Sequence, residues 1–457
     1  MKMHKVFILK VKFTTRSTIT LLTILTLSAF YTSCSVNKQI AKQANSILIN
    51  DSIIKHGHIG ISIYEPSTNK FWYNYQADKY FVPASNTKLF ALYAGLKYLG
   101  DSIPAFRYFE NQNEIFIEPT GDPTLLHPDF KTQNAFNFLK QKNKPVTISN
   151  NKWRSNALGF GWPWDDFTSD YTVERNAMPV YGNVIKWIQI KDKPAESMQE
   201  GILVYSEPDV TWKVNFSTDT SRNTFSVDRS KDENIFEITF GKERRIEIDI
   251  PFITKGVTTA AELLKDTLNL PVTTSTNNVT ANYKTVYSQA SDSLFKIMMH
   301  RSDNFFAEQT LLMASNEKLG YMNERRMIDT LLKTDLKDLP QRPRWVDGSG
   351  LSRYNLFSPA DFIYLLQKLK NDYGLERLKN ILPTGGEGTL SSLYKNDSGY
   401  IFAKTGTLSN HVALSGFIIT KKDKLLIFSI LPGSFMGSAT PVRKAIEKFL
   451  SGIREKY

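Results

Sequence analysis

The sequence predicts an α/β chain of the α+β kind: an antiparallel sheet flanked by helices forms the core, and a mainly β module is inserted into it. Two patterns lead to this prediction. Both ends of the 457-residue chain alternate between strand-like and helical segments, whereas residues 105–280 consist largely of short β-like runs separated by polar turns. A hydrophobic content of 41% is typical of an ordered globular protein, and this length has room for more than one hydrophobic core.

Residues 1–34 have the layout of a secretory signal. Five cations precede an uncharged apolar run, STITLLTILTLSAFY, which is shorter than a typical membrane span. Cys34, the only cysteine of the chain, follows this run in a stretch, YTSC, that resembles a bacterial lipobox. The resemblance implies that Cys34 is lipidated, so we expect an exported, periplasmic protein with an N-terminal lipid anchor in a membrane. An ordinary signal peptide cleaved nearby, or an uncleaved anchor, is the alternative.

Charge and composition exclude several classes of function. The formal net charge is +12, but five of these charges lie in the first 16 residues, and no lysine or arginine run marks a nucleic-acid surface. The six histidines have no metal-ligand spacing, and a single cysteine forms no C-x-x-C site. No glycine-rich nucleotide motif follows a strand. The sequence therefore predicts no nucleic-acid partner, no metal and no cofactor.

The segment after Cys34 predicts a tether, a helix, a hairpin and a second helix, in that order. In HIGISIYEPSTNKFWYNYQAD, apolar and β-branched positions alternate on both sides of a turn at Glu65 to Asn69, as half-buried antiparallel strands require. From Ser85 onward leucines recur at helical spacing until Gly100 ends the run. Residues 105–280 then contain the β-like runs NEIFIE, GILVYS, NIFEITF and RRIEIDI.

Amphipathic helices resume at SQASDSLFKIMMHRSDNFFAEQTLLMAS, and the strand-like stretch YIFAKTGTLSNHVALSGFIITKKDKLLIFSIL precedes a C-terminal helix. We therefore expect residues 35–104 and 281–457 to form one discontinuous domain, with residues 105–280 as an inserted β-rich domain. The hairpin before Ser85 should share one antiparallel sheet with the strand that contains residues 404–406.

Three short motifs occur in a fixed order. Ser85 and Lys88 form S-x-x-K, a spacing that recurs seven more times in the chain and has little meaning alone. S-D-N at 302–304 and K-T-G at 404–406 occur once each. Separately, each motif fits a helix cap, a turn or a strand end. Together they are the signature of serine acyl-transfer enzymes that act on D-alanyl peptides and β-lactams.

With these motifs the chain resembles the class C low-molecular-mass penicillin-binding proteins, the D-alanyl-D-alanine carboxypeptidase/endopeptidase family. The stretches PASNTKLF, GDPTL, SDNFFAE, DGSGLSR, GTL and AKTGTLS belong to the resemblance. It implies a β-lactamase/transpeptidase-like core with a large insertion between the first two motifs. It also implies a serine D-alanyl-D-alanine carboxypeptidase or D,D-endopeptidase, which acts on peptidoglycan stem peptides through an acyl-enzyme and binds penicillin and other β-lactams.

The resemblance implies a role for each catalytic position. Ser85 is the nucleophile and Lys88 its general base, whose charged form the ammonium of Lys404 would disfavour. Ser302 would bridge the two lysines and relay a proton to the leaving amine. Asn304 would hold the substrate's peptide amide and fix Lys88.

The K-T-G strand is implied to bind substrate. Thr405, Gly406 and Thr407 are the implied substrate-binding residues, and the two threonines would bind the terminal carboxylate. The backbone N–H groups of Ser85 and Thr407 would stabilise the tetrahedral oxyanion. The aspartates of S-D-N and of D-G-S-G are expected to be structural.

Two other functions compete with this one. A class A β-lactamase places a deacylating glutamate some tens of residues after S-D-N, but DTLLKTDLKDLPQRPRW contains none, so we expect penicillin to inhibit the protein. A catalytically silent lipoprotein scaffold that binds peptidoglycan would have no need for the complete motif set. Carboxypeptidase and endopeptidase activity both attack a D-alanine carbonyl and differ only in the leaving amine, so both remain open.

Overall fold

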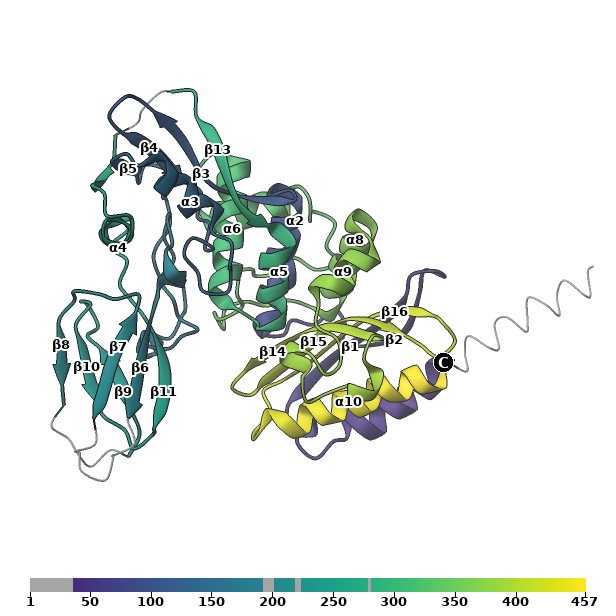
Figure 1. Ribbon diagram of the computed structural model, residues 1–457. Coiled ribbons are helices and arrows are strands. Elements are labelled where there is room, and N and C mark those ends of the chain that lie inside the picture. The colour runs from purple at the N-terminus through teal and green to yellow at the C-terminus, as the bar shows by residue number, and fades with distance from the viewer. Residues whose placement is uncertain (1–35, 192–200, 218–222, 278–280) are drawn as a thin grey trace, which may run out of the picture.

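The computed structural model describes residues 36–191, 201–217, 223–277 and 281–457 (Figure 1). The signal and Cys34 lie outside the described residues. Within those ranges, no helix has both the length and the apolar character needed to cross a bilayer. Antiparallel sheets flanked by helices confirm the predicted α+β class.

The central sheet joins the two ends of the chain. Its order is β14-β15-β16-β1-β2, and every neighbouring pair is antiparallel. The strands are β1 (His58–Glu65), β2 (Lys70–Tyr75), β14 (Ile401–Leu408), β15 (His411–Ile419) and β16 (Leu425–Gly433). The expectation that the early hairpin and the K-T-G strand share one sheet is therefore confirmed.

Helices cover both faces of this sheet (Figure 1). On one face α10 (Ala439–Lys456) lies beside the helical residues 36–44 and their continuation η1 (Asn45–Ile49), with η2 (Ile54–His56) leading into β1. On the other face α8 (Pro359–Tyr373) packs against β16 and β1. Because both faces are covered, β15 and β16 are buried along almost their whole length and consist mainly of apolar residues.

A helical layer carries the first two motifs. The 3₁₀ turn η3 (Ala84–Thr87) leads into α2 (Lys88–Tyr98), which packs against α6 (Asn304–Leu319) and is buried on nearly all sides. The other helical segments here are α5 (Ser291–His300), α7 (Glu324–Lys333), α9 (Leu375–Ile381) and η6 (Gly388–Leu390). The short η7 (Lys395–Asp397) lies beside α10 instead, since Asp397 contacts Arg454. The α-helix thus begins three residues after the serine at which the leucine pattern predicts it.

A second, mixed sheet has the order β12-β5-β4-β3-β13. Its elements are β3 (Ser102–Glu110), β4 (Ile115–Pro119), β5 (Val146–Ser149), β12 (Val272–Ser275) and β13 (Lys284–Ala290), with α3 (Asn134–Lys142) and α4 (Thr258–Leu268) alongside. β13 pairs antiparallel with β3. The sheet therefore extends slightly beyond residues 105–280 at both ends.

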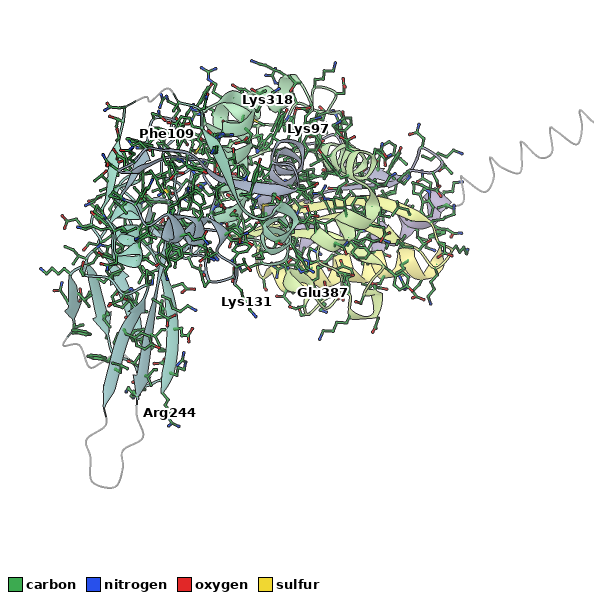
Figure 2. The ribbon with its side chains drawn as sticks, turned by 45° about the horizontal axis from the view of Figure 1, so that its top comes forward. Lys97, Phe109, Lys131, Arg244, Lys318 and Glu387 are labelled. Carbon is green, nitrogen blue, oxygen red and sulfur yellow. The ribbon has the colours of Figure 1, made fainter. Side chains whose placement is uncertain are left out.

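Two three-stranded sheets complete the chain, in the orders β8-β10-β9 and β11-β6-β7. They comprise β6 (Val184–Lys191), β7 (Ile202–Glu207), β8 (Val214–Phe216), β9 (Ser226–Arg229), β10 (Phe236–Thr239) and β11 (Arg245–Pro251), and are preceded by η4 (Trp164–Asp166) and η5 (Tyr181–Asn183). In Figure 2, Arg244 marks the end of these strands that points away from the helices carrying Lys97 and Lys318.

Candidate active site

Ser85 and Lys88 meet at the junction of η3 and α2. The Nζ of Lys88 lies 2.9 Å from the Oγ of Ser85, because side chains three residues apart lie on the same helix face. Ala84, just before the serine, has a φ of 47°, a left-handed conformation that is costly for a residue with a Cβ. The conformation of Ala84 places Ser85 in the 3₁₀ turn just before α2.

Two further groups bind the amine of Lys88, which is fully buried. Its Nζ lies 2.6 Å from Oδ1 of Asn304 and 2.7 Å from the carbonyl oxygen of Ser349. The amide of Asn304 is oriented by its Nδ2, which donates to the carbonyl of Tyr171 at 2.9 Å. Both partners of the amine therefore present oxygen atoms that only accept hydrogen bonds.

Burial lowers the pKa of Lys88 to about 8, since the ammonium form loses its hydration. The charges of Asp303, Asp347 and Glu308 oppose this shift. The sequence analysis attributed the lowered pKa of Lys88 to the charge of Lys404. This is wrong, because burial is the main cause. Burial is the largest cause of the lowered pKa of both lysines. Repulsion from Lys88 also helps to hold the pKa of Lys404 well below its ordinary value.

The S-D-N and K-T-G motifs meet through Ser302 and Lys404. The Nζ of Lys404 donates to Oγ of Ser302 and to the carbonyl of Thr405, both at 2.8 Å. Ser302 has a φ of 62°, again left-handed, at the sharp turn between α5 and α6. In the described residues the hydroxyl of Ser302 is hydrogen-bonded to Lys404 and not to Lys88. The expected bridge between the two lysines is therefore not formed.

Gly406 allows β14 to approach the nucleophile. A Cβ at this position would lie 2.7 Å from the carbonyl oxygen of Pro83 and 3.0 Å from the backbone nitrogen of Ser85. Nδ2 of Asn86 donates to the carbonyl of Lys404 at 2.9 Å and ties the same turn to the strand. A larger residue at Gly406 would push the strand away from the serine.

Thr405 and Thr407 have side chains on the other face of β14, because side chains alternate along a strand. Oγ1 of Thr405 donates to Oγ1 of Thr389 at 2.8 Å. Oγ1 of Thr407, an exposed residue, accepts a hydrogen bond from Arg443 of α10. The two threonines are thus placed at the outer edge of the sheet, in contact with η6 and α10.

The sequence reasoning missed the groups that hold the Ser349 carbonyl. The N–H of Ser349 donates to Oε1 of Glu308 at 2.7 Å, and Arg175 donates to Oε2 of Glu308 at 3.0 Å. Both members of this ion pair are buried. Ser349 and Glu308 lie within DGSGLSR and SDNFFAE, which could have marked them. Arg175 has no such signal, since it precedes Glu308 by 133 residues.

The two motif aspartates make structural contacts, in keeping with expectation. Asp303 caps α6 by accepting from the N–H of Phe306 at 2.8 Å. Asp347 accepts from the N–H groups of Gly350 and Ser352 and from Nε1 of Trp162. These bonds shape the S-D-N turn and the loop that carries the Ser349 carbonyl.

A cleft of about 670 Å³ opens beside the S-D-N turn. Ser302 and Asn304 line one side, and Tyr171, Lys186 and Asp249 line the other. The serine of S-D-N is therefore reachable from the space between the helical layer and the inserted strands. Among the described residues, no three His, Cys, Asp or Glu side chains gather in a way that could hold a metal ion.

Comparisons with known proteins identify the family of the chain. Residues 40–456 match the model of the D-Ala-D-Ala carboxypeptidase 3 (S13) family. D-alanyl-D-alanine carboxypeptidase DacB of Haemophilus influenzae is 21% identical over 450 residues, which cover 88% of this chain and 91% of the relative. Penicillin-sensitive carboxypeptidase A of Dictyostelium discoideum is 24% identical over 463 residues, with 85% of each chain covered. The crystal structure of penicillin binding protein 4 from Haemophilus influenzae has the same fold, with a TM-score of 0.71, 18% identity, and coverage of 91% of this chain and 99% of that one.

Proposed function

The chain belongs to the D-Ala-D-Ala carboxypeptidase 3 (S13) family and is a serine-type carboxypeptidase, and from this premise we propose that Ser85 is its nucleophile. The substrates are D-alanyl peptides of peptidoglycan, and β-lactams acylate the same serine. In the acylation step, Oγ of Ser85 bonds to the D-alanine carbonyl carbon and the C–N bond to the leaving amine breaks.

The bonding of Lys88 is the observation that carries this proposal. A neutral amine has two N–H donors and one lone pair. Oδ1 of Asn304 and the carbonyl of Ser349 take both donors, which leaves the lone pair for the hydroxyl proton of Ser85 at 2.9 Å. With a pKa of about 8, roughly a tenth of Lys88 is the free amine at pH 7. Lys88 is thus suited to act as the general base.

The proton taken from Ser85 has to reach the leaving amine. Ser302, hydrogen-bonded to Lys404, borders the cleft and is the hydroxyl that we assign to this transfer. Asn304 would hold the substrate's peptide amide as well as Lys88. Because Gly406 brings β14 close to the nitrogen of Ser85, the N–H groups of Ser85 and Thr407 are assigned to the oxyanion.

Residues 35–104 and 281–457 form, in this proposal, a discontinuous catalytic domain, and residues 105–280 an inserted β-rich domain. The central sheet supports the division, since its five strands all come from the two outer segments. All three motifs also lie in those segments.

The contacts of the buried Glu308 favour slow deacylation and argue against β-lactamase activity. Both oxygens of Glu308 are occupied, one by the N–H of Ser349 and the other by Arg175, so this carboxylate is not available to activate water. We therefore propose that penicillin inhibits the protein as a long-lived acyl-enzyme.

Digestion of two substrates tests the proposal. Purified protein is incubated with a pentapeptide precursor and with purified peptidoglycan, and the products are identified by mass. Free D-alanine supports carboxypeptidase activity, and conversion of cross-linked dimers to monomers supports endopeptidase activity. Fluorescent penicillin should label the wild type and not Ser85→Ala. If neither substrate reacts and no label is bound, the scaffold hypothesis replaces this one.

Acylation by penicillin should rise with pH through about 8. The free amine is the active form of Lys88, and the fraction of free amine increases as the pH passes its lowered pKa. Second-order acylation rates measured between pH 6 and pH 9 test this. A rate that stays flat or falls over this interval would rule out Lys88 as the base.

We also propose that Cys34 carries the lipid that anchors a periplasmic protein to a membrane. Its position as the sole cysteine after the apolar run supports this. Cys34→Ala should move the protein from the membrane fraction to the soluble periplasmic fraction, as measured by immunoblotting. Unchanged membrane retention, or a mature N-terminus mapped elsewhere, would contradict lipidation.

A further inference from the structure

One stretch of the insertion, residues 162–175, holds both groups that accept hydrogen bonds from Lys88. These acceptors are Oδ1 of Asn304 and the carbonyl oxygen of Ser349. The first is held directly, because Nδ2 of Asn304 donates to the backbone carbonyl of Tyr171 at 2.9 Å. The orientation of this acceptor is therefore fixed from the insertion.

The second acceptor is held at one end of the stretch by Trp162. The indole Nε1 donates to Oδ2 of Asp347 at 3.0 Å, and the same oxygen accepts from the N–H of Ser352 at 2.7 Å. Oδ1 of Asp347 accepts from the N–H of Gly350 at 2.8 Å. Since Asp347 precedes Ser349 in the chain and its two N–H partners follow it, this buried carboxylate closes the loop that presents the Ser349 carbonyl. The indole fixes the carboxylate in turn.

Arg175, at the other end of the stretch, binds the same loop through Glu308. Nη1 of Arg175 donates to Oε2 of Glu308 at 3.0 Å, and Oε1 of Glu308 accepts from the N–H of Ser349 at 2.7 Å. The guanidinium also lies 5.4 Å from the ring centroid of Trp162, so the two side chains pack against each other. Trp162 and Arg175 therefore hold the Ser349 loop together, each through a buried carboxylate.

The two acceptors determine where the lone pair of Lys88 points. A neutral amine has two N–H bonds and one lone pair, so the directions of the two hydrogen bonds set the direction of the third position. A general base has to lie within hydrogen-bond reach of the proton that it removes, and small misplacements of reacting groups are costly in rate. If the Ser349 carbonyl shifts, the lone pair turns away from the hydroxyl of Ser85, which lies 2.9 Å from the amine.

We propose that Trp162 and Arg175 are positioning residues of the acyl-transfer reaction, so that the insertion forms part of the catalytic centre. The inference rests on the proposed function and deepens it, because it gives the inserted domain a share in the chemistry at Ser85. Both residues act through the Ser349 loop on the orientation of Lys88. They should therefore affect the rate at which bound penicillin acylates the serine, and have little effect on the affinity for penicillin.

Acylation kinetics of Trp162→Phe test the proposal. Phenylalanine keeps an aromatic ring beside Arg175 and removes the indole N–H that binds Asp347. Purified protein is mixed with fluorescent penicillin over a range of concentrations, which separates the dissociation constant of the initial complex from the first-order acylation constant. The acylation constant should fall by about 3- to 10-fold, while the dissociation constant stays within about 2-fold of the wild-type value.

The final amount of label per protein separates positioning from stability, because it counts the folded, active sites. Trp162→Phe should reach the wild-type amount at a lower rate. Trp164→Phe is the matched control: it makes the same change at an indole that is 73% exposed, and should alter neither the amount nor the rate. Arg175→Lys keeps a cation for Glu308 and should retain more of the acylation constant than Arg175→Met.

A wild-type acylation constant in Trp162→Phe would overturn the proposal. A smaller final amount of label with an unchanged constant would overturn it too, since that result indicates a role in stability alone. An equal fall in Trp164→Phe, or a change confined to the dissociation constant, would also contradict it. If the wild type takes up no penicillin and cleaves no D-alanyl peptide, the proposed function itself fails, and the role of Trp162 with it.

Discussion

Lys88→Arg is expected to slow the acylation of Ser85 by penicillin by about 10²- to 10⁴-fold, the usual contribution of general-base assistance. Arginine keeps a cation and much of the bulk, but guanidinium does not deprotonate in a protein and cannot accept the serine proton. Its place beside Asn304 and Ser349 would be filled by a group that only donates. Acylation rates with fluorescent penicillin, together with thermal unfolding to verify folding, measure this effect.

Lys404→Arg is the matched variant. It keeps N–H donors next to Ser302 and changes the geometry of the side chain. We expect it to retain more acylation than Lys88→Arg, since Lys404 takes no proton from the nucleophile in this mechanism. Equal losses in the two variants, or near wild-type acylation in Lys88→Arg, would show that the roles of the two lysines are assigned wrongly.

Arg175→Met is expected to lower the free energy of unfolding by about 3 to 5 kcal/mol, the typical cost of breaking a buried ion pair from one side. The substitution leaves Glu308 buried without its cationic partner. Burial already raises the pKa of Glu308, so the variant can relieve part of the cost by protonating this carboxyl. The deficit should therefore shrink as the pH is lowered from 8 to 5, as measured by urea unfolding at each pH.

Two variants control this experiment. Arg326→Met changes an exposed arginine and should alter stability by about 0.5 kcal/mol or less. The double variant Arg175→Met/Glu308→Gln removes both charges and should recover part of the loss. If Arg175→Met is as stable as Arg326→Met, the pair does not hold the Ser349 loop in the way proposed here.

The sequence alone predicts those parts of the site that depend on neighbouring residues. The contact between Ser85 and Lys88 follows from one helical turn, and the hairpin of β1 and β2 follows from alternation on both sides of a turn. The order of the three motifs is a property of the chain and does not depend on its fold. For the same reason the motifs predict the family from the sequence alone.

Only the tertiary structure decides the chemistry of Lys88. Its lowered pKa is due first to burial, which depends on every element packed around the amine and has no signature in the residues next to it. Glu308 binds the N–H of Ser349 and is itself bound by Arg175, so the pair positions the Ser349 carbonyl. Arg175 lies far from Glu308 in the sequence and meets it only in the folded chain. Arg443 likewise reaches Thr407 from α10 because the sheet places its edge strand beside that helix. Motif spacing specifies which groups react, whereas long-range packing determines whether they are desolvated and oriented.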